Sequence, residues 1–307
     1  MGKVLLFPGQ GAQFVGMGND VIREFPEVKV IYEEASDRLG FDIKNLIMNG
    51  PDDKLTMTEN AQPAILTTSY ALWSIIQSRC ELSPAAALGH SLGEYSALVT
   101  AGSISFADAV MITHLRGKFM QEAVPVGFGK MAAIMAPAVE VERECAKAKK
   151  SNMYCDIANY NGPNQQVVSG TKEGVNYVED QLKERFKIFD LTVSAPFHCK
   201  LMEPAREKLA SFINDIGITS PSFTIIENID SKLIKSNDNI AELLLNQIIS
   251  PVKWIDNINT ACGFSQSMIE FGPGSVLRSL IRRIDKKIKV QNIEKVNDID
   301  SFLKDCN

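Results

Sequence analysis

The stretch Ala85-Ala86-Ala87-Leu88-Gly89-His90-Ser91-Leu92-Gly93 decides the fold, because three local patterns meet in it. The short apolar run favours a buried strand, the glycines around Ser91 favour a tight turn, and a helical pattern continues from Glu94 to Gly102. A strand that enters a helix through G-x-S-x-G is typical of α/β proteins that expose a nucleophilic serine at the helix N-terminus. A chance match of three fixed positions is the competing interpretation, and the strand-turn-helix context favours a nucleophilic Ser91.

Outward from this stretch, the chain alternates short apolar runs with helical patterns. Val4 to Phe7 predicts a buried strand, which a glycine-rich turn follows from Pro8 to Gln13. The segment from Ala64 to Arg79 has helical spacing after a break at Gln62-Pro63, and residues 222–227 and 267–271 are further strand candidates. These patterns predict an α/β-hydrolase-like core with a parallel sheet.

A different order of elements begins after residue 126. Strand, helix, strand, strand, helix and strand follow one another between residues 127 and 195, which is the split βαβ order of ferredoxin-like domains. We therefore predict a catalytic domain formed by residues 1–126 and 196–307, with a ferredoxin-like βαββαβ domain of residues 127–195 inserted into it.

Composition excludes several classes of protein. The 307 residues are 45% hydrophobic and 22% charged, with a formal charge of −5, which argues against a disordered chain and against general nucleic-acid binding. No apolar run approaches the ~18 residues that would span a membrane, and the N-terminus does not resemble a signal peptide. The six cysteines form no C-x-x-C pair, so we expect reduced thiols in a cytoplasmic protein and no metal site.

A serine hydroxyl needs a base that accepts its proton, and the chain has three histidines. His90 lies inside the turn, so its side chain should point away from Ser91, and His114 lies in a helical pattern, where a structural role is the commoner one. His198, in a loop that returns from the inserted domain, is the candidate base by elimination. No acid between Ser91 and His198 stands out as a third member of a triad. A Ser91–His198 dyad, its imidazole held by a backbone carbonyl, is the sharper hypothesis.

Arg116 lies among Met, Ile and Leu residues of a predicted helix. An arginine in such a position usually extends to the surface or pairs with an acid. If it instead faces Ser91, its planar guanidinium would bind a substrate carboxylate through two hydrogen bonds.

Five motifs in register resemble those of the malonyl-CoA:acyl-carrier-protein transacylase family of type II fatty-acid synthesis. The resemblance spans Val4 to about Ile284. The motifs are Phe7-Pro8-Gly9-Gln10-Gly11-Ala12-Gln13, Gly89-His90-Ser91-Leu92-Gly93-Glu94-Tyr95, Arg116-Gly117 with Phe197-His198, Asn159-Tyr160-Asn161-Gly162-Pro163, and Gln247 ahead of Ser250-Pro251-Val252.

This resemblance implies a ping-pong reaction. Malonyl-CoA would malonylate Ser91 and release coenzyme A, and the acyl group would then pass to the phosphopantetheine thiol of acyl carrier protein. It also implies that coenzyme A is a substrate, that no metal or redox cofactor is needed, and that the protein is a monomer. The implied roles are His198 as base and acid, the backbone N–H groups of Gln10 and Leu92 as oxyanion hole, Arg116 as carboxylate clamp, and the Gln247 main-chain carbonyl as the group that orients His198.

The sequence suggests two further sites. Phe197 resembles a residue that accompanies malonyl rather than methylmalonyl choice in polyketide acyltransferases, where a bulky ring would crowd a 2-methyl group. A basic stretch is either a solvated helix face or a docking surface for an acidic carrier protein. It consists of Arg278, Arg282, Arg283, Lys286, Lys287 and Lys289.

Three alternatives remain open from the sequence. A trans-acting acyltransferase of a polyketide synthase would use the same residues and differ only in its carrier protein. A serine hydrolase or thioesterase is less expected, because Arg116 and the missing triad acid argue against it. A non-catalytic module that binds a carrier protein would not need Ser91, His198 and Arg116 together.

Overall fold

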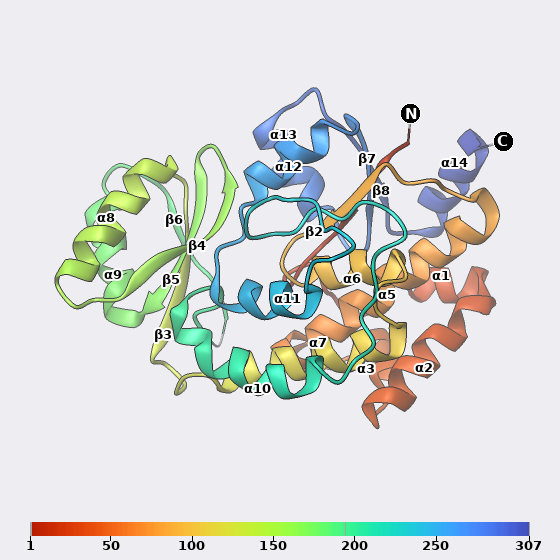
Figure 1. Cartoon of the computed structure of the whole chain (residues 1–307), viewed down its shortest axis with the longest axis horizontal. Helices are drawn as coiled ribbons and strands as arrows, with labels where there is room; N and C mark the ends of the chain where they lie inside the picture. Colours follow the sequence, from red (N-terminus) through yellow and green to blue (C-terminus); the bar gives the residue numbers. More distant parts are fainter. Residues whose placement is uncertain (1, 194, 307) are drawn as a thin grey trace.

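The computed structural model describes residues 2–193 and 195–306 and contains two separate sheets, each with its own helices (Figure 1). The larger sheet is parallel and has the strand order β2-β1-β7-β8. Its strands are β1 (Val4–Phe7), β2 (Ala86–Gly89), β7 (Ser267–Phe271) and β8 (Lys289–Ile293). The predicted parallel sheet is thus confirmed, with β8 as a strand that the sequence patterns did not indicate.

Strand β1 lies inside this sheet, between β2 and β7. Val4 pairs with Ala86 on one side and with Met268 on the other. Leu5 and Phe7 pack into the core on one face of the sheet, whereas Val4 and Leu6 pack into the core on the other face. Because both faces are covered, the strand is apolar throughout, as buried parallel strands are.

Helices cover both faces of the parallel sheet. One core contains residues of α2, α5 and α7, and the other contains residues of α12 and α13. The helices of this part are α1 (Asn19–Glu24), α2 (Lys29–Leu39), α3 (Ile43–Asn49), α4 (Asp52–Thr56), α5 (Thr58–Cys80), α6 (Gly93–Thr100), α7 (Phe106–Glu122), α10 (Glu203–Ile213), α11 (Ile240–Ile249), α12 (Trp254–Cys262), α13 (Val276–Ile284) and α14 (Val296–Cys306), with short 3-10 turns at Pro26–Val28 and Lys200–Met202.

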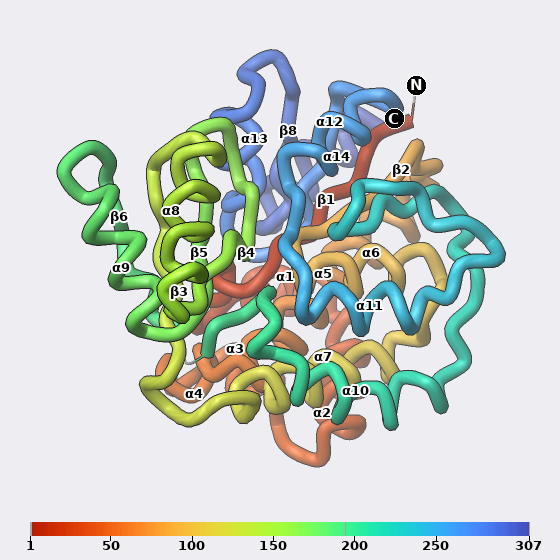
Figure 2. Tube along the Cα trace, turned by 60° about the vertical axis from the view of Figure 1, so that its left-hand side comes forward, coloured from red at the N-terminus to blue at the C-terminus, as the bar shows by residue number. Residues whose placement is uncertain are grey.

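The second sheet is antiparallel and stands to one side of the first, with α8 and α9 packed on it (Figure 2). Its strand order is β4-β5-β3-β6, which with the chain order βαββαβ is the predicted ferredoxin-like arrangement. The predicted fold class is therefore confirmed; the domain boundaries at 126/127 and 195/196 stay predictions. The elements are β3 (Gly129–Ile134), α8 (Ala138–Lys150), β4 (Cys155–Gly162), β5 (Gln165–Thr171), α9 (Lys172–Leu182) and β6 (Ile188–Asp190).

Helix α5 differs from its prediction, because it begins at Thr58 and continues through Pro63. A proline inside a helix lacks the N–H that would bond the carbonyl four residues earlier, here that of Glu59. The His114 Nδ1 lies 2.9 Å from this Glu59 carbonyl oxygen and supplies the missing donor. His114 is thus the structural histidine that its helical pattern indicated.

Two other expectations are wrong. The strand predicted over residues 222–227 is reduced to isolated bridges, in which Ile225 pairs with Ala87 and Ile226 with Leu233. Cys80 and Cys306 form a disulfide, so only the other four cysteines are free thiols. The reason is tertiary: α14 packs on α5 and brings together two cysteines that are 226 residues apart. Among the described residues, no helix is long and apolar enough to cross a membrane.

Candidate active site

Ser91 lies in the turn between β2 and α6, with a backbone φ of +53°. The flanking glycines meet a different requirement, because each lies against another segment of backbone. A Cβ on Gly89 would lie 1.9 Å from the carbonyl carbon of Gly93, and a Cβ on Gly93 would lie 2.0 Å from the Phe7 carbonyl oxygen. The strained conformation therefore belongs to the serine, while the glycines let α6 approach β1 and β2 closely.

Asn228 holds this turn from the other side, and none of the sequence motifs indicated it. Its Oδ1 accepts a hydrogen bond of 2.7 Å from the Ser91 backbone N–H, and its Nδ2 donates at 2.8 Å to the Gly89 carbonyl. The asparagine is fully buried. Its only signal in the sequence was a polar position two residues after Phe223-Thr224-Ile225-Ile226.

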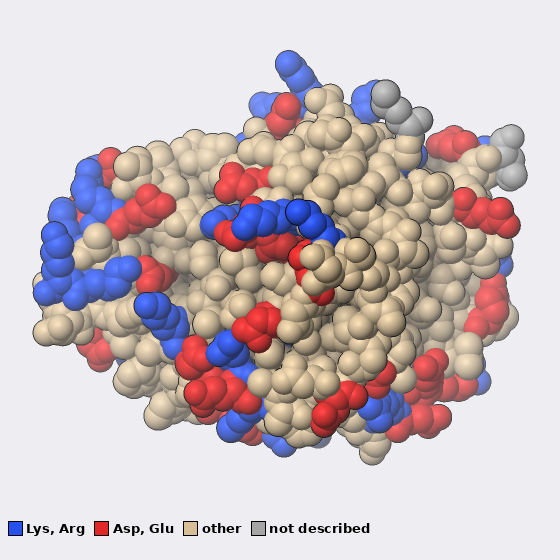
Figure 3. All heavy atoms as spheres, in the orientation of Figure 1, with Lys and Arg blue, Asp and Glu red and all other residues tan. Residues whose placement is uncertain are grey.

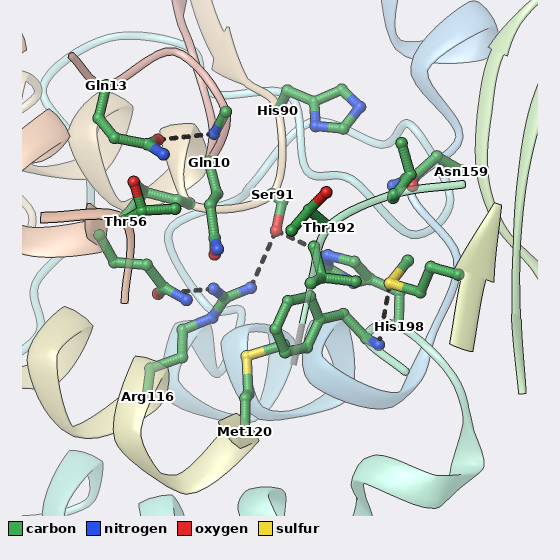
Figure 4. Close-up of a pocket in the computed structure, with 17 residues that line it drawn as sticks. Gln10, Gln13, Thr56, His90, Ser91, Arg116, Met120, Asn159, Thr192 and His198 are labelled. Carbon is green, nitrogen blue, oxygen red and sulfur yellow. Dashed lines mark hydrogen bonds between the residues drawn. The ribbon is translucent and has the colours of Figure 1, made fainter. Parts of the chain in front are cut away.

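His198 lies directly beside the serine (Figure 4). Its Nε2 is 2.7 Å from Ser91 Oγ, and its Nδ1 is 2.9 Å from the main-chain carbonyl oxygen of Gln247. A carbonyl only accepts, so Nδ1 carries the proton and Nε2 is free to accept the serine proton. Gln247 lies in the last turn of helix α11, and Pro251, four residues later, has no N–H for its main-chain carbonyl. This carbonyl accepts a hydrogen bond of 3.4 Å from the Ser250 N–H and can therefore also accept one from His198.

The electrostatic surroundings of His198 favour a neutral imidazole. Burial, the largest cause, and the guanidinium of Arg116 together lower its pKa to about 3. A neutral imidazole is the form that accepts a proton from serine.

Arg116 extends from α7 into the same site and is 1% exposed, so it does not reach the surface. Its Nη2 donates at 3.0 Å to Ser91 Oγ and at 2.8 Å to Gln247 Oε1, and its Nη1 donates at 2.7 Å to Gln62 Oε1. Every described hydrogen-bond partner of this cation is an uncharged oxygen. The site thus contains a buried positive charge directly beside the candidate nucleophile.

These groups line a cavity of about 290 Å³ (Figure 4). Gln10 and Leu92 flank Ser91 on its polar side, and Met120, Met131 and Phe197 form an apolar wall. His90 also lines the cavity. Its ring is bonded through Nε2 to Asn161 Oδ1 at 2.8 Å and packs on Trp254, so it does not serve the serine as a base. Among the described residues, no group of His, Cys, Asp and Glu side chains is arranged to hold a metal ion.

The structure therefore brings together all but one group of the predicted site residues. Ser91, His198, Arg116 and Gln247 are directly hydrogen-bonded to one another. The basic residues lie elsewhere, exposed on α13 and in the turn after it, and they are Arg278, Arg282, Arg283, Lys286 and Lys287. Gln62, Asn228 and Glu94 are buried partners that were not among the predicted site residues.

Comparison with known proteins places this geometry in a family. Residues 4–305 match the family model described as acyl transferase domain. The chain is 40% identical over 294 residues to the malonyl CoA-acyl carrier protein transacylase of Bacillus subtilis, which covers 94% of this chain and 92% of the relative. The crystal structure of FabD from Acinetobacter baumannii superposes with a TM-score of 0.95 at 37% identity and covers 99% of this chain and 98% of that one.

A third similar structure is a complex described as a type II PKS acyl-carrier protein with its malonyl-transacylase. The similarity has a TM-score of 0.94 at 37% identity and covers 99% of this chain and all of that one (100%). With a family model that matches almost the whole length, and relatives that are similar over nearly their entire chains, this chain belongs to the malonyl-CoA:acyl-carrier-protein transacylases of the acyl transferase family.

Proposed function

We propose that this chain transfers a malonyl group from malonyl-CoA to acyl carrier protein through an ester on Ser91. The observation that carries the proposal is the buried guanidinium of Arg116, which donates to the Oγ of the serine itself. A positive charge in that place suits an acyl group that ends in a carboxylate, as malonyl does.

In the first half-reaction, Ser91 Oγ attacks the thioester carbonyl carbon while its proton passes to His198 Nε2. The backbone N–H groups of Gln10 and Leu92 hold the oxyanion, as the position of both residues beside Ser91 supports. When the C–S bond breaks, the coenzyme A thiolate takes the proton from His198. The carrier-protein thiol then attacks the ester carbonyl in the reverse sequence, and Ser91 Oγ recovers its proton.

Arg116 binds the malonyl carboxylate in this scheme. The carboxylate accepts from Nη2, in place of Ser91 Oγ, and from the second N–H of Nη1. The apolar wall beside it fits the malonyl methylene, and the Phe197 ring leaves little room for a 2-methyl group. The apolar side chains that line the site also limit the access of water to the ester.

Acyl carrier protein docks on α13 in this proposal. The protein as a whole has a net charge of −5, and the face seen in Figure 3 carries side chains of both signs. Lys and Arg side chains lie at the top of the molecule, above α13. A cavity of about 500 Å³ lies between α13 and the β4–β5 turn, and Arg282, Arg283 and Lys286 line it.

Reversing the charge of Arg282 and Lys286 should raise the KM for the carrier protein and leave the rate of Ser91 acylation by malonyl-CoA unchanged.

In our main proposal, the acyl carrier protein that receives the malonyl group is the one of fatty-acid synthesis. The similarity to a malonyl-transacylase that was solved with a polyketide-synthase carrier protein supports that client as a second candidate. Comparing kcat/KM for holo carrier proteins of the two kinds distinguishes the two candidates.

Because one chain supplies every group of the site, we also propose that the protein is a monomer, and we keep the cytoplasmic location as a proposal.

Peptide mass mapping tests the first half-reaction. After brief incubation with malonyl-CoA, the peptide that contains Ser91 should carry one malonyl group, and the Ser91→Ala variant should carry none. Free malonate without a detectable adduct would instead support the hydrolase alternative.

A further inference from the structure

Glu94 is a buried carboxyl group for which the scheme above has no role. It lies in the first turn of α6 and is 1% exposed, although it does not line the cavity. Removing a carboxyl group from water is unfavourable unless hydrogen bonds replace its hydration, so the contacts of Glu94 indicate what it does.

The carboxyl group contacts the side chain of Gln247. The Nε2 of Gln247 donates at 2.6 Å to Glu94 Oε2 and at 3.0 Å to the Ser91 carbonyl oxygen. On the other side of the same amide, Oε1 accepts from Arg116 Nη2 at 2.8 Å. The Gln247 main-chain carbonyl is the acceptor for His198 Nδ1. One glutamine thus joins the nucleophile, the base and the cation.

The orientation of this amide follows from the chemistry of its neighbours. A guanidinium has five donors and no acceptor, so the atom that faces Arg116 must be the amide oxygen. The amide nitrogen then faces Glu94 and the Ser91 carbonyl, both of which accept. A flipped amide would place two donors together at Arg116 and two acceptors together at Glu94.

We propose that Glu94 is a positioning residue for malonyl transfer, because it fixes the side-chain amide of Gln247 and thereby holds the Arg116 guanidinium in place for the malonyl carboxylate. This inference rests on the proposed function. Glu94 touches neither substrate nor the reacting atoms. Its carboxyl group also accepts from the Asn228 backbone, and the positioning role proposed here is the one through Gln247.

The protonation state of Glu94 does not alter this role. Burial raises its pKa to about 8, with the Gln247 amide acting in the opposite direction as the next largest cause. The charged groups that face it are Arg116, which lowers the pKa, and Glu227, which raises it. A carboxyl oxygen accepts a hydrogen bond from the amide nitrogen in both forms.

The positioning role of Glu94 predicts different effects on the transfer of malonyl and acetyl groups. Malonyl needs the Arg116 guanidinium in a defined place, whereas acetyl has no carboxylate and needs only the Ser91–His198 pair. Replacing Glu94 by leucine removes the acceptor and lets the Gln247 amide turn. We expect the acylation rate of Ser91 by malonyl-CoA to fall about 10- to 100-fold, and that by acetyl-CoA to change less than about threefold. Glu94→Gln keeps one acceptor oxygen and should lie between the wild type and Glu94→Leu.

The experiment is a double-mutant cycle on Ser91 acylation, followed by intact-protein mass with each thioester. The variants are Glu94→Leu, Glu94→Gln, Gln247→Leu and the two double variants, with folding checked by circular dichroism. If Glu94 acts through Gln247, substituting Glu94 in the Gln247→Leu background should hardly change the ratio of the acylation rates with malonyl-CoA and acetyl-CoA. If Glu94→Leu does not fold, Glu94→Gln carries the same cycle.

Equal losses with both thioesters, or fully additive losses in the double variants, would overturn the positioning role. The wild-type arm separates this failure from a failure of the proposed function. A wild-type protein that takes no malonyl group refutes the transacylase proposal itself, whereas a malonylated wild type with additive variants refutes only the role of Glu94.

Discussion

At the scale of single residues, we propose that Arg116 sets the choice of acyl group, because its hydrogen bonds to described residues go to uncharged oxygens and leave its charge available for a carboxylate. Arg116→Met fills similar space without the charge. We expect Ser91 acylation by malonyl-CoA to slow by roughly 100-fold, as the loss of charge-assisted hydrogen bonds implies, and acylation by acetyl-CoA to change far less. Arg23→Met, on the exposed surface of α1, is the matched control. Equal slowing with both thioesters would contradict the assignment.

The pH dependence of acylation is a second test at this scale. An imidazole with an ordinary pKa would be half protonated near pH 6.5, and protonated histidine cannot accept the serine proton. Because the pKa of His198 is lowered to about 3, the base stays neutral as the pH falls through 6.5. The rate of Ser91 acylation, measured by rapid quench, should therefore be level between pH 5 and pH 7. A descending limb centred near pH 6.5 would show that the histidine titrates normally.

At the scale of elements, the helix α5 depends on a side chain from α7. His114→Ala leaves the Glu59 carbonyl without its donor, and we expect a loss of about 1–3 kcal/mol in the free energy of unfolding, measured in urea. In a Pro63→Ala background, the restored N–H of residue 63 bonds the same carbonyl, so His114→Ala should cost less. An identical cost in both backgrounds would mean that packing of the ring, for example on Phe41, accounts for the whole effect.

Sequence patterns predicted the elements whose signals are local. The strand β1, the turn at Ser91 and the βαββαβ order follow from apolar runs and glycines that lie close together in the chain. The start of α5 was missed because Pro63 leaves the Glu59 carbonyl without its helical donor. The side chain that replaces this donor, His114, lies 55 residues after Glu59 in the sequence. Gln62, Asn228 and Glu94 were missed for the same reason, since their partners come from distant segments. The family resemblance, rather than the local pattern, indicated Gln247 and Leu92.

At the scale of the whole molecule, the disulfide between Cys80 and Cys306 joins α14 to the end of α5. A cross-link between residues so far apart in sequence restricts the unfolded chain strongly, and we expect its reduction to cost about 2–5 kcal/mol in the free energy of unfolding. Urea unfolding with and without a phosphine reductant measures this loss. Cys80→Ser should abolish the difference between the two conditions, and Cys262→Ser, which removes a free thiol, should keep it. No effect of the reductant on the wild type would contradict the cross-link.

The account as a whole depends on a complete transfer through one serine. The most direct measurement is a single-turnover experiment in which the protein is malonylated, freed of malonyl-CoA, and mixed with holo acyl carrier protein, with both masses followed over time. We predict that the malonyl mass leaves the enzyme at the rate at which it appears on the carrier thiol, and that Ser91→Ala and His198→Ala give no transfer. A malonyl-enzyme that keeps its acyl group, or releases it as free malonate while the carrier protein stays unmodified, would contradict the proposal.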